Sequence, residues 1–152
     1  MRLALFEPDI PQNLGAFIRL AACLGVPLDI IEPCGFPVDD KRIRRAAMDY
    51  YALATIVRHA SWAAFRRDQP PGRLVLLTTS GATVFPNVAF QTNDILLVGR
   101  ESAGVPADVH TTADLRIRIP LQPGLRSLNV VLAATMVLSE GLRQTQGFAQ
   151  LS

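Results

Sequence analysis

The stretch EPDIPQNLGAFIRLAACLG, residues 7–25, holds the first side chains whose spacing could serve chemistry. Gly15 and Arg19 are four residues apart, so they share one face of a helix. A glycine beside an arginine would let another backbone, such as that of RNA, approach this face closely. The alternative is structural, with Asn13 at the helix start, Gly15 in a packing role and Arg19 on the surface. Spacing alone favours the structural alternative.

The stretch FPVDDKRIRRAAMDYY, residues 36–51, gathers basic side chains on a short expected helix, which Asp39 or Asp40 is suited to cap. Its first turns carry four cations: Lys41, Arg42, Arg44 and Arg45. Cations near a helix N-terminus oppose the helix dipole, so helix stability does not account for them. A solvated basic face is one explanation. An anionic partner, with Tyr50 and Tyr51 stacking on bases, explains the cluster better.

The stretch LLVGRESAGVPADV, residues 96–109, places a glycine-bounded loop after an apolar run. A buried strand is expected to end at Gly99, and Gly104 lies in the loop that follows. Ligands bind at the carboxyl ends of parallel strands, so Glu101 is a candidate binding carboxylate. The alternative is an ordinary strand-to-helix loop with Pro106 at the first helical position.

The stretch LRIRIPLQPGLRSLNVVLAATMV, residues 115–137, joins a loop shaped by proline and glycine to an apolar helix. We expect Ser127 to cap this helix and Asn129 to lie in its first turn, where backbone N–H groups are free. Ser127 is a weak candidate for a nucleophile, because no GxSxG surrounds it. His59 and His110 lie in no recognisable triad context and are expected to be structural or surface residues.

These four stretches lie among alternating strand-like and helix-like segments. The expected strands are 2–6, 28–31, 54–57, 73–79, 94–99 and 115–119. The expected helices are 12–24, about 40–48, 61–67, 106–112 and 127–145. This alternation predicts an α/β fold with a mainly parallel sheet and helices on both faces. The run 115–119 alternates in polarity, so one of its faces is expected to be polar or to lie near a sheet edge.

The composition favours a single cytoplasmic domain, residues 1–152, with 146–152 as a frayed tail. Of the 152 residues, 49% are hydrophobic and only 18% are charged, which suggests an apolar surface covered by a second copy in a homodimer. No apolar run reaches the roughly 18 residues of a membrane span, and no signal peptide is expected. Cys23 and Cys34 suit neither a disulfide scaffold nor a metal site.

Taken in order, the four stretches resemble the SPOUT-class RNA 2′-O-methyltransferases, most closely the single-domain enzymes that act on the wobble nucleotide of tRNA. The resemblance covers residues 1–146. Arg100 stands where close relatives often carry proline, a difference expected to tune the loop. The family implies a deep trefoil knot in the C-terminal part of the sheet, a homodimer, and S-adenosylmethionine as cofactor without a metal ion.

The resemblance also implies roles for individual residues. The catalytic set would be Arg19 with the supporting polar residues Asn13, Glu101, Ser127 and Asn129. The cofactor would contact Leu77, Gly99, Glu101, Ile119, Leu121, Ser127 and Leu128. The substrate RNA, an anticodon stem-loop of tRNA, would contact Lys41, Arg42, Arg44, Arg45 and Arg126, although Arg126 is equally suited to a structural role in its loop.

The implied chemistry is methylation of the ribose 2′-hydroxyl, which needs the hydroxyl oxygen aligned with the methyl group and its proton removed. A guanidinium is effectively always charged, so we expect Arg19 to bind phosphate and stabilise the developing alkoxide. The alternative is that Arg19 is deprotonated with help from the nucleotide's own phosphate and acts as the base. Three other functions agree with the sequence. The protein could methylate another position of tRNA or rRNA, serve as a non-catalytic RNA-binding module of the same fold, or be a generic small-molecule enzyme.

Overall fold

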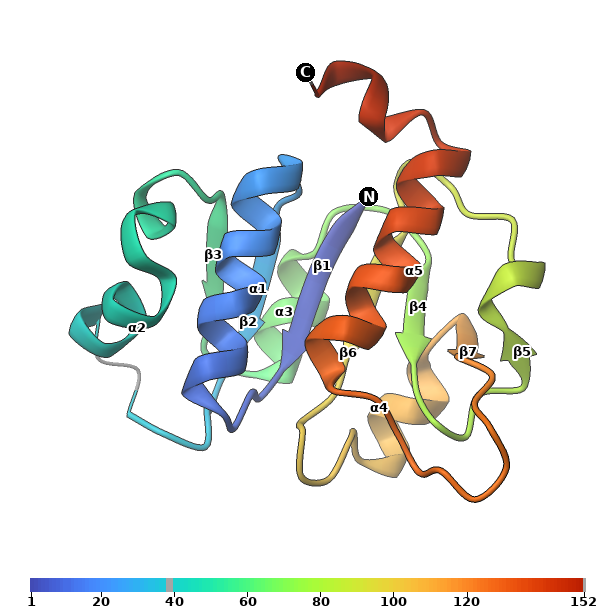
Figure 1. Cartoon of the computed structure of the whole chain (residues 1–152). Helices are drawn as coiled ribbons and strands as arrows, with labels where there is room; N and C mark the ends of the chain where they lie inside the picture. Colours follow the sequence, from blue (N-terminus) through green and yellow to red (C-terminus); the bar gives the residue numbers. More distant parts are fainter. Residues whose placement is uncertain (38–39, 152) are drawn as a thin grey trace.

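Residues 1–37 and 40–151, which the computed structural model describes, form one sheet of seven parallel strands in the order β3-β2-β1-β6-β4-β7-β5 (Figure 1). The strands are β1 (Arg2–Phe6), β2 (Leu28–Ile31), β3 (Ile56–His59), β4 (Leu74–Leu77), β5 (Thr83–Val84), β6 (Ile95–Val98) and β7 (Leu115–Arg118). The apolar runs predicted all of these except β5, which is too short to show a pattern.

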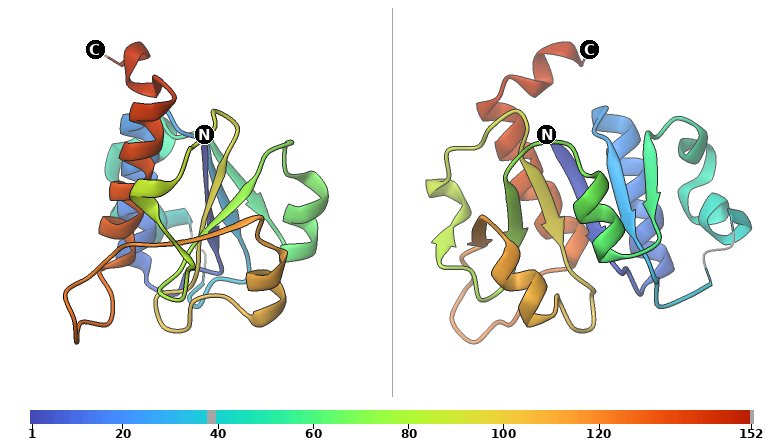
Figure 2. Two further views of the ribbon diagram at one scale, coloured as in Figure 1. Left: turned by 90° about the vertical axis from the view of Figure 1, so that its right-hand side faces the viewer. Right: turned by 180° about the vertical axis from the view of Figure 1, so that it is seen from behind.

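Helices cover both faces of the sheet, as the alternation of elements predicted. The helices are α1 (Pro11–Leu24), α2 (Asp40–Ala47), α3 (Trp62–Asp68), α4 (Ala107–Thr112) and α5 (Val130–Gln144), with 3-10 helices η1 (Met48–Ala52), η2 (Phe85–Asn87) and η3 (Gly147–Gln150). Figure 2 shows α1, α2 and α5 on one face and α3 and α4 on the other. The larger core lies on the α1 face and includes Phe17 and Leu138, and the smaller one includes Phe65 and Val109.

The structure shifts several expected boundaries: β4 ends at Leu77 and not at residue 79, and α5 begins at Val130 and not at residue 127. The strand expected at 54–57 is β3, which begins two residues later and takes in His59. Burial of Asp29 explains this shift, because His59 Nε2 lies 2.8 Å from Asp29 Oδ1 in the interior. Within the tail expected to fray from residue 146, residues 147–150 form the 3-10 helix η3.

Strand β7 has the half-polar character that its sequence predicted. Ile117 is fully buried, while Leu115, Arg116 and Arg118 are half-buried. Only the two-residue strand β5 separates β7 from the edge of the sheet.

None of the helices in the described part of the chain is long and apolar enough to cross a membrane. Among the same residues, no group of three or more His, Cys, Asp and Glu side chains is placed to hold a metal ion.

Candidate active site

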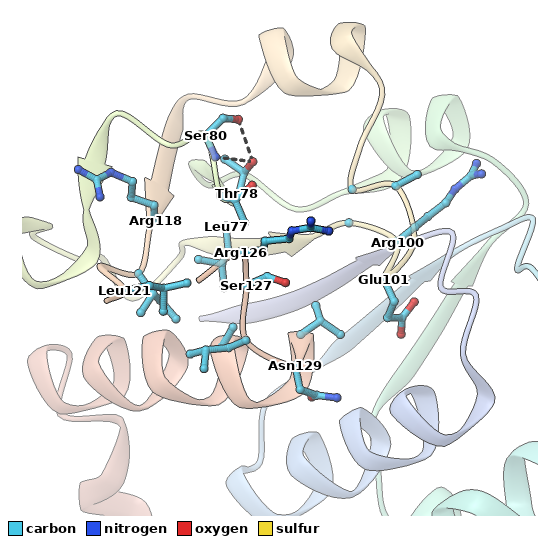
Figure 3. A pocket seen from close by; sticks show the side chains of 18 of the residues that line it. Leu77, Thr78, Ser80, Arg100, Glu101, Arg118, Leu121, Arg126, Ser127 and Asn129 are labelled. Atoms are coloured by element: carbon cyan, nitrogen blue, oxygen red, sulfur yellow. Dashed lines mark hydrogen bonds between the residues drawn. The ribbon is translucent and has the colours of Figure 1, made fainter. Parts of the chain in front are cut away.

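A pocket of about 990 Å³ opens at the carboxyl ends of β4, β6 and β7 (Figure 3). Three loops with the ends of their flanking elements build it: residues 76–80 at the end of β4, 99–105 after β6, and 118–130 from the end of β7 to the start of α5. Asn13 at the start of α1 adds to the wall. Open parallel sheets bind their ligands at this edge, so the position of the pocket agrees with the expectation for such a fold.

The structure brings together every residue that the resemblance assigns to the cofactor. All of them line this pocket: Leu77, Gly99, Glu101, Ile119, Leu121, Ser127 and Leu128. Gly99 is required by close packing, because a Cβ there would lie 2.5 Å from the carbonyl carbon of Gly104. The backbone groups of Arg100 and Gly104 also pair with each other in both directions at 2.9 Å, which closes the loop tightly.

Asn129, and not Ser127, caps helix α5. Its Oδ1 accepts hydrogen bonds from the backbone N–H groups of Val131 (2.9 Å) and Leu132 (3.3 Å), so the helix begins at Val130. The prediction of Ser127 as the cap was therefore wrong. Ser127 lies two residues before the cap, in the exposed loop that lines the pocket.

A chain of amide and carboxyl groups joins α5 to α1 and to the loop after β6. Asn129 Nδ2 donates to Asn13 Oδ1 (3.2 Å), and Asn13 Nδ2 donates to Glu101 Oε1 (3.0 Å). Asn13 is the third residue of α1, and the capping position is held by Ile10 without a side-chain hydrogen bond. Asn13 thus lies at the helix start as expected but does not cap it, and its side chain joins this network.

Asp9 is a member of this network that the sequence analysis missed. Asp9 accepts hydrogen bonds from the backbone N–H of Glu101 (3.1 Å) and from the hydroxyl of Ser102, and its own N–H donates to Glu101 Oε2 (3.0 Å). The hydrogen bond between the two carboxyls lowers the pKa of Asp9. Burial, followed by the same hydrogen bond, raises the pKa of Glu101. The position of Asp9, directly after β1, was the signal in the sequence.

Arg100 contacts the last residue of the neighbouring strand β1, Phe6, and the residue after it, Glu7. Its guanidinium pairs with the carboxylate of Glu7 and lies 5.8 Å from the centre of the Phe6 ring. The loop after β6 is thus fastened to residues 7–9 through Arg100 as well as through Asp9. This contact gives a physical basis for the loop-tuning role expected of Arg100.

Arg19 is not among the residues that line the pocket. Its guanidinium lies 4.8 Å from the centre of the Tyr50 ring, and its side chain is exposed. Gly15 does not open this face, because a Cβ there would lie 2.6 Å from the Cβ of Ala46. The structural alternative for Gly15 is therefore correct, and the idea that RNA approaches at this glycine is wrong.

The basic residues of α2 lie outside the pocket. Lys41, Arg44 and Arg45 are exposed, and Arg44 lies 5.2 Å from the centre of the Tyr51 ring. The side chain of Arg42, and Asp39 as a whole, lie outside the described residues, as does the side chain of Asp40. Arg126 is different, because it lines the pocket and points into it from the loop before α5 (Figure 3).

A polar group that the sequence analysis missed lines the pocket beside β4. Ser80 Oγ lies 3.2 Å from Thr78 Oγ1 and 3.4 Å from His110 Nε2, and Arg118 also lines the wall. His110, expected to be structural or at the surface, is a wall residue of the pocket. The run TTSG directly after a strand was the available signal for this group. His59, in contrast, has the expected structural role.

The fold and site define a class: a parallel α/β protein whose ligand pocket is made by three loops from neighbouring strands, with an amide–carboxyl network at its wall. The chain belongs to the SpoU rRNA Methylase family, whose profile matches residues 1–139.

Similar proteins extend this comparison over the whole chain. The tRNA (cytidine(34)-2′-O)-methyltransferase of Ancylobacter novellus is 57% identical over 99% of this chain and 96% of its own length. The protein of the same name from Escherichia coli K12 is 42% identical over 95% and 93%.

Solved structures agree with this comparison. A structure described as giving insight into the 2-OH methylation of C/U34 on tRNA has a TM-score of 0.90 at 35% identity, over 96% of both chains. The methyltransferase AviRb of Streptomyces viridochromogenes, in complex with AdoMet, has a TM-score of 0.81 at 28% identity. That match covers 95% of this chain and 60% of AviRb.

Proposed function

We propose that this protein transfers a methyl group from S-adenosylmethionine to the ribose 2′-hydroxyl of the wobble nucleotide of tRNA, position 34, occupied by cytidine or a modified uridine. The observation that carries the proposal is the pocket at the carboxyl ends of β4, β6 and β7, which meets the Asn13–Glu101–Asn129 network. Likeness over almost the full length to methyltransferases named for cytidine 34 selects this nucleotide among possible substrates.

The pocket is suited to S-adenosylmethionine in size and lining. Its volume of about 990 Å³ lies at the upper end of the usual range for small-molecule sites, and Leu77, Ile119 and Leu128 give it an apolar wall. The similar AviRb structure is a complex with AdoMet. The bound cofactor supplies an electrophilic methyl group, and the reaction requires no metal ion.

The protein's own contribution is to orient the hydroxyl and stabilise the charge that develops on it. Asn13 and Asn129 present amide groups whose directions are fixed by hydrogen bonds, which favours one position of the ribose. Arg19 keeps its proton, binds a phosphate of the RNA and stabilises the developing alkoxide. Ser127 lines the same wall, beside the cofactor.

The active enzyme is a homodimer formed through the outer face of α1 and α5. These helices lie side by side on one face of the sheet (Figure 1). Leu132 and Met136, one turn apart on α5, expose 60% and 44% of their surface. Arg19 is exposed on the neighbouring helix and does not reach its own pocket, so the dimer would direct it toward the pocket of the second subunit.

The C-terminal part of the sheet forms a deep trefoil knot. Strand β4 lies between β6 and β7, and residues 119–129 connect β7 to α5 across the sheet, from the α4 face to the opposite one (Figure 2). The loop after β4 lies against strand β7 itself, where a Cβ on Gly81 would lie 2.4 Å from the carbonyl carbon of Ile117.

The substrate RNA is an anticodon stem-loop, contacted by the basic side chains of α2 and by Arg126, and the enzyme works in the cytoplasm. Lys41, Arg44 and Arg45 supply exposed positive charge, and Tyr50 and Tyr51 lie beside it for stacking. Arg126 points into the pocket, which suits contact with the phosphate of the target nucleotide.

Two measurements on the purified protein test this function. Calorimetry should detect binding of S-adenosylmethionine, and incubation with bulk tRNA should transfer a labelled methyl group to ribose. Binding without transfer would favour a non-catalytic RNA-binding module instead, and transfer to rRNA but not to tRNA would assign a different substrate.

A further inference from the structure

Asp9 is not a pocket residue, yet it holds the loop that forms a pocket wall. One oxygen of its carboxylate accepts from the N–H of Glu101 (3.1 Å) and the other from the hydroxyl of Ser102. Its own N–H donates to Glu101 Oε2 (3.0 Å). Asp9 therefore fixes Glu101 twice, at its backbone and at its carboxyl group.

Asp9 is itself held rigidly from the other side. The preceding residue, Pro8, is buried, and its carbonyl accepts a hydrogen bond from the N–H of Gly35 (3.0 Å). A Cβ on Gly35 would lie 2.5 Å from the Cβ of Asp9, so the two backbones are in close contact. This packing leaves Asp9 no space to move toward the β2–α2 connection.

The hydrogen bond to Glu101 in turn fixes the orientation of the side-chain amides of Asn13 and Asn129. Asn129 Oδ1 is occupied by two backbone N–H groups of α5, so its Nδ2 must face Asn13 Oδ1. The Nδ2 of Asn13 then needs an acceptor, which is Glu101 Oε1 at 3.0 Å. A displaced Glu101 would leave Asn13 free to rotate.

The pKa shifts of Asp9 and Glu101 agree with this arrangement. The pKa of Asp9 is lowered by its hydrogen bond with Glu101, and the pKa of Glu101 is raised by burial and then by that hydrogen bond. Asp9 is therefore ionised more readily than Glu101, which limits the repulsion between the two neighbouring carboxyls. Glu101 then remains an acceptor for Asn13 through its other oxygen.

We propose that Asp9 is a positioning residue for methyl transfer: its hydrogen bonds hold Glu101 so that Asn13 and Asn129 meet the ribose hydroxyl in one orientation. The inference rests on the proposed function. Asp9 does not line the pocket, so its removal should change the rate of the transfer step more than the binding of cofactor or RNA. A displacement of reacting groups by about 1 Å costs on the order of 100-fold in rate.

The test compares Asp9→Ala, Asp9→Asn and the control Asp108→Ala, which removes an exposed carboxylate outside the pocket. For Asp9→Ala we expect kcat to fall about 10- to 100-fold, while the KM for tRNA and the Kd for S-adenosylmethionine stay within about twofold. Asp9→Asn should stay within about threefold of the wild type, because its oxygen still accepts from Glu101 N–H and its amide reaches Ser102. The control should match the wild type.

Several outcomes would overturn the role of Asp9. An unchanged kcat for Asp9→Ala would do so, as would an equal loss of cofactor affinity, or an Asn variant as slow as the Ala variant. If Asp9→Ala does not fold, Ser102→Ala removes one contact of the same carboxylate, and an unchanged kcat there contradicts the role. Wild-type protein that transfers no methyl group to tRNA would contradict the proposed function, whatever the variants do.

Discussion

Asn129 combines a structural and a functional role in one side chain. Its oxygen caps α5 through Val131 and Leu132, and its amide nitrogen donates to Asn13 across the pocket wall. The cap explains why a strongly apolar helix begins with a polar residue. The second contact ties the start of that helix to the network of Asn13 and Glu101, so the cap and the proposed functional role can be separated by changing only the nitrogen.

The substitution Asn129→Asp separates them. Aspartate caps helices as well as asparagine does, and a negative charge at a helix N-terminus is favourable by about 0.3–1 kcal/mol, so the free energy of unfolding should not fall. The donor to Asn13 is lost, so the rate of methyl transfer should fall by about 10-fold or more. Urea unfolding and single-turnover kinetics measure the two effects.

The variant Asn129→Ala is the matched control, because it loses both contacts and should also lose about 0.5–2 kcal/mol of stability. Wild-type turnover in Asn129→Asp would show that the amide nitrogen has no part in the reaction.

At the scale of elements, helices α1 and α2 come into close contact at one point, where the backbone of Gly15 on α1 lies against Ala46 on α2. A Cβ on Gly15 would lie 2.6 Å from the Cβ of Ala46 and 2.7 Å from its carbonyl carbon and oxygen. Helix α2 carries the basic residues, so this contact sets where the positive charge lies relative to Asn13 on α1. The glycine acts through packing and not through an opening for RNA.

Gly15→Ala should therefore destabilise the fold. Alanine gains about 1 kcal/mol in helix propensity, but the clash with α2 costs more, and we expect a net loss of about 1–3 kcal/mol in denaturant unfolding. The double variant with Ala46→Gly should recover only part of this loss, because the carbonyl of residue 46 still lies in the way. A Gly15→Ala protein as stable as the wild type would contradict the packing role.

The exposed arginines of α2 should determine the salt dependence of tRNA binding. Each lost phosphate contact flattens the slope of log K against log salt by about 0.7–0.9, so Arg44→Ala with Arg45→Ala should flatten it by about 1.5. The control is Arg66→Ala with Arg67→Ala on α3, which removes the same charge from the opposite face of the sheet. Equal slopes for the two double variants would exclude α2 from the RNA surface.

The sequence predicted the elements well where a pattern repeats, and the site less well where contacts are tertiary. The α/β alternation follows from the apolar runs, whereas the pocket residues from Leu77 to Leu128 were expected from the family resemblance. Asp9 was missed because its partners, Glu101 and Ser102, are about 90 residues away in the chain. Ser127 was mistaken for the cap because serine and asparagine are equally suited to that position.

At the scale of the whole molecule, the proposed homodimer would bury the exposed apolar side chains of α5, Leu132 and Met136. Leu132→Glu should shift the protein from dimer to monomer in sedimentation equilibrium, because a buried unpaired charge is costly at an interface. It should leave the monomer folded, since this side chain is 60% exposed in the single chain. The control Leu53→Glu changes an equally apolar side chain, 72% exposed after η1, and should remain dimeric. A dimer unaffected by Leu132→Glu would place the interface elsewhere.

The central claim is the identity of the methylated nucleotide. The most direct measurement maps 2′-O-methyl groups by mass spectrometry in tRNA from cells with and without this gene. We predict that a ribose methyl group at nucleotide 34, on cytidine or a modified uridine, is lost without the gene and restored by the purified enzyme with S-adenosylmethionine. Loss of a methyl group at another position, with nucleotide 34 unchanged, would contradict the proposed function.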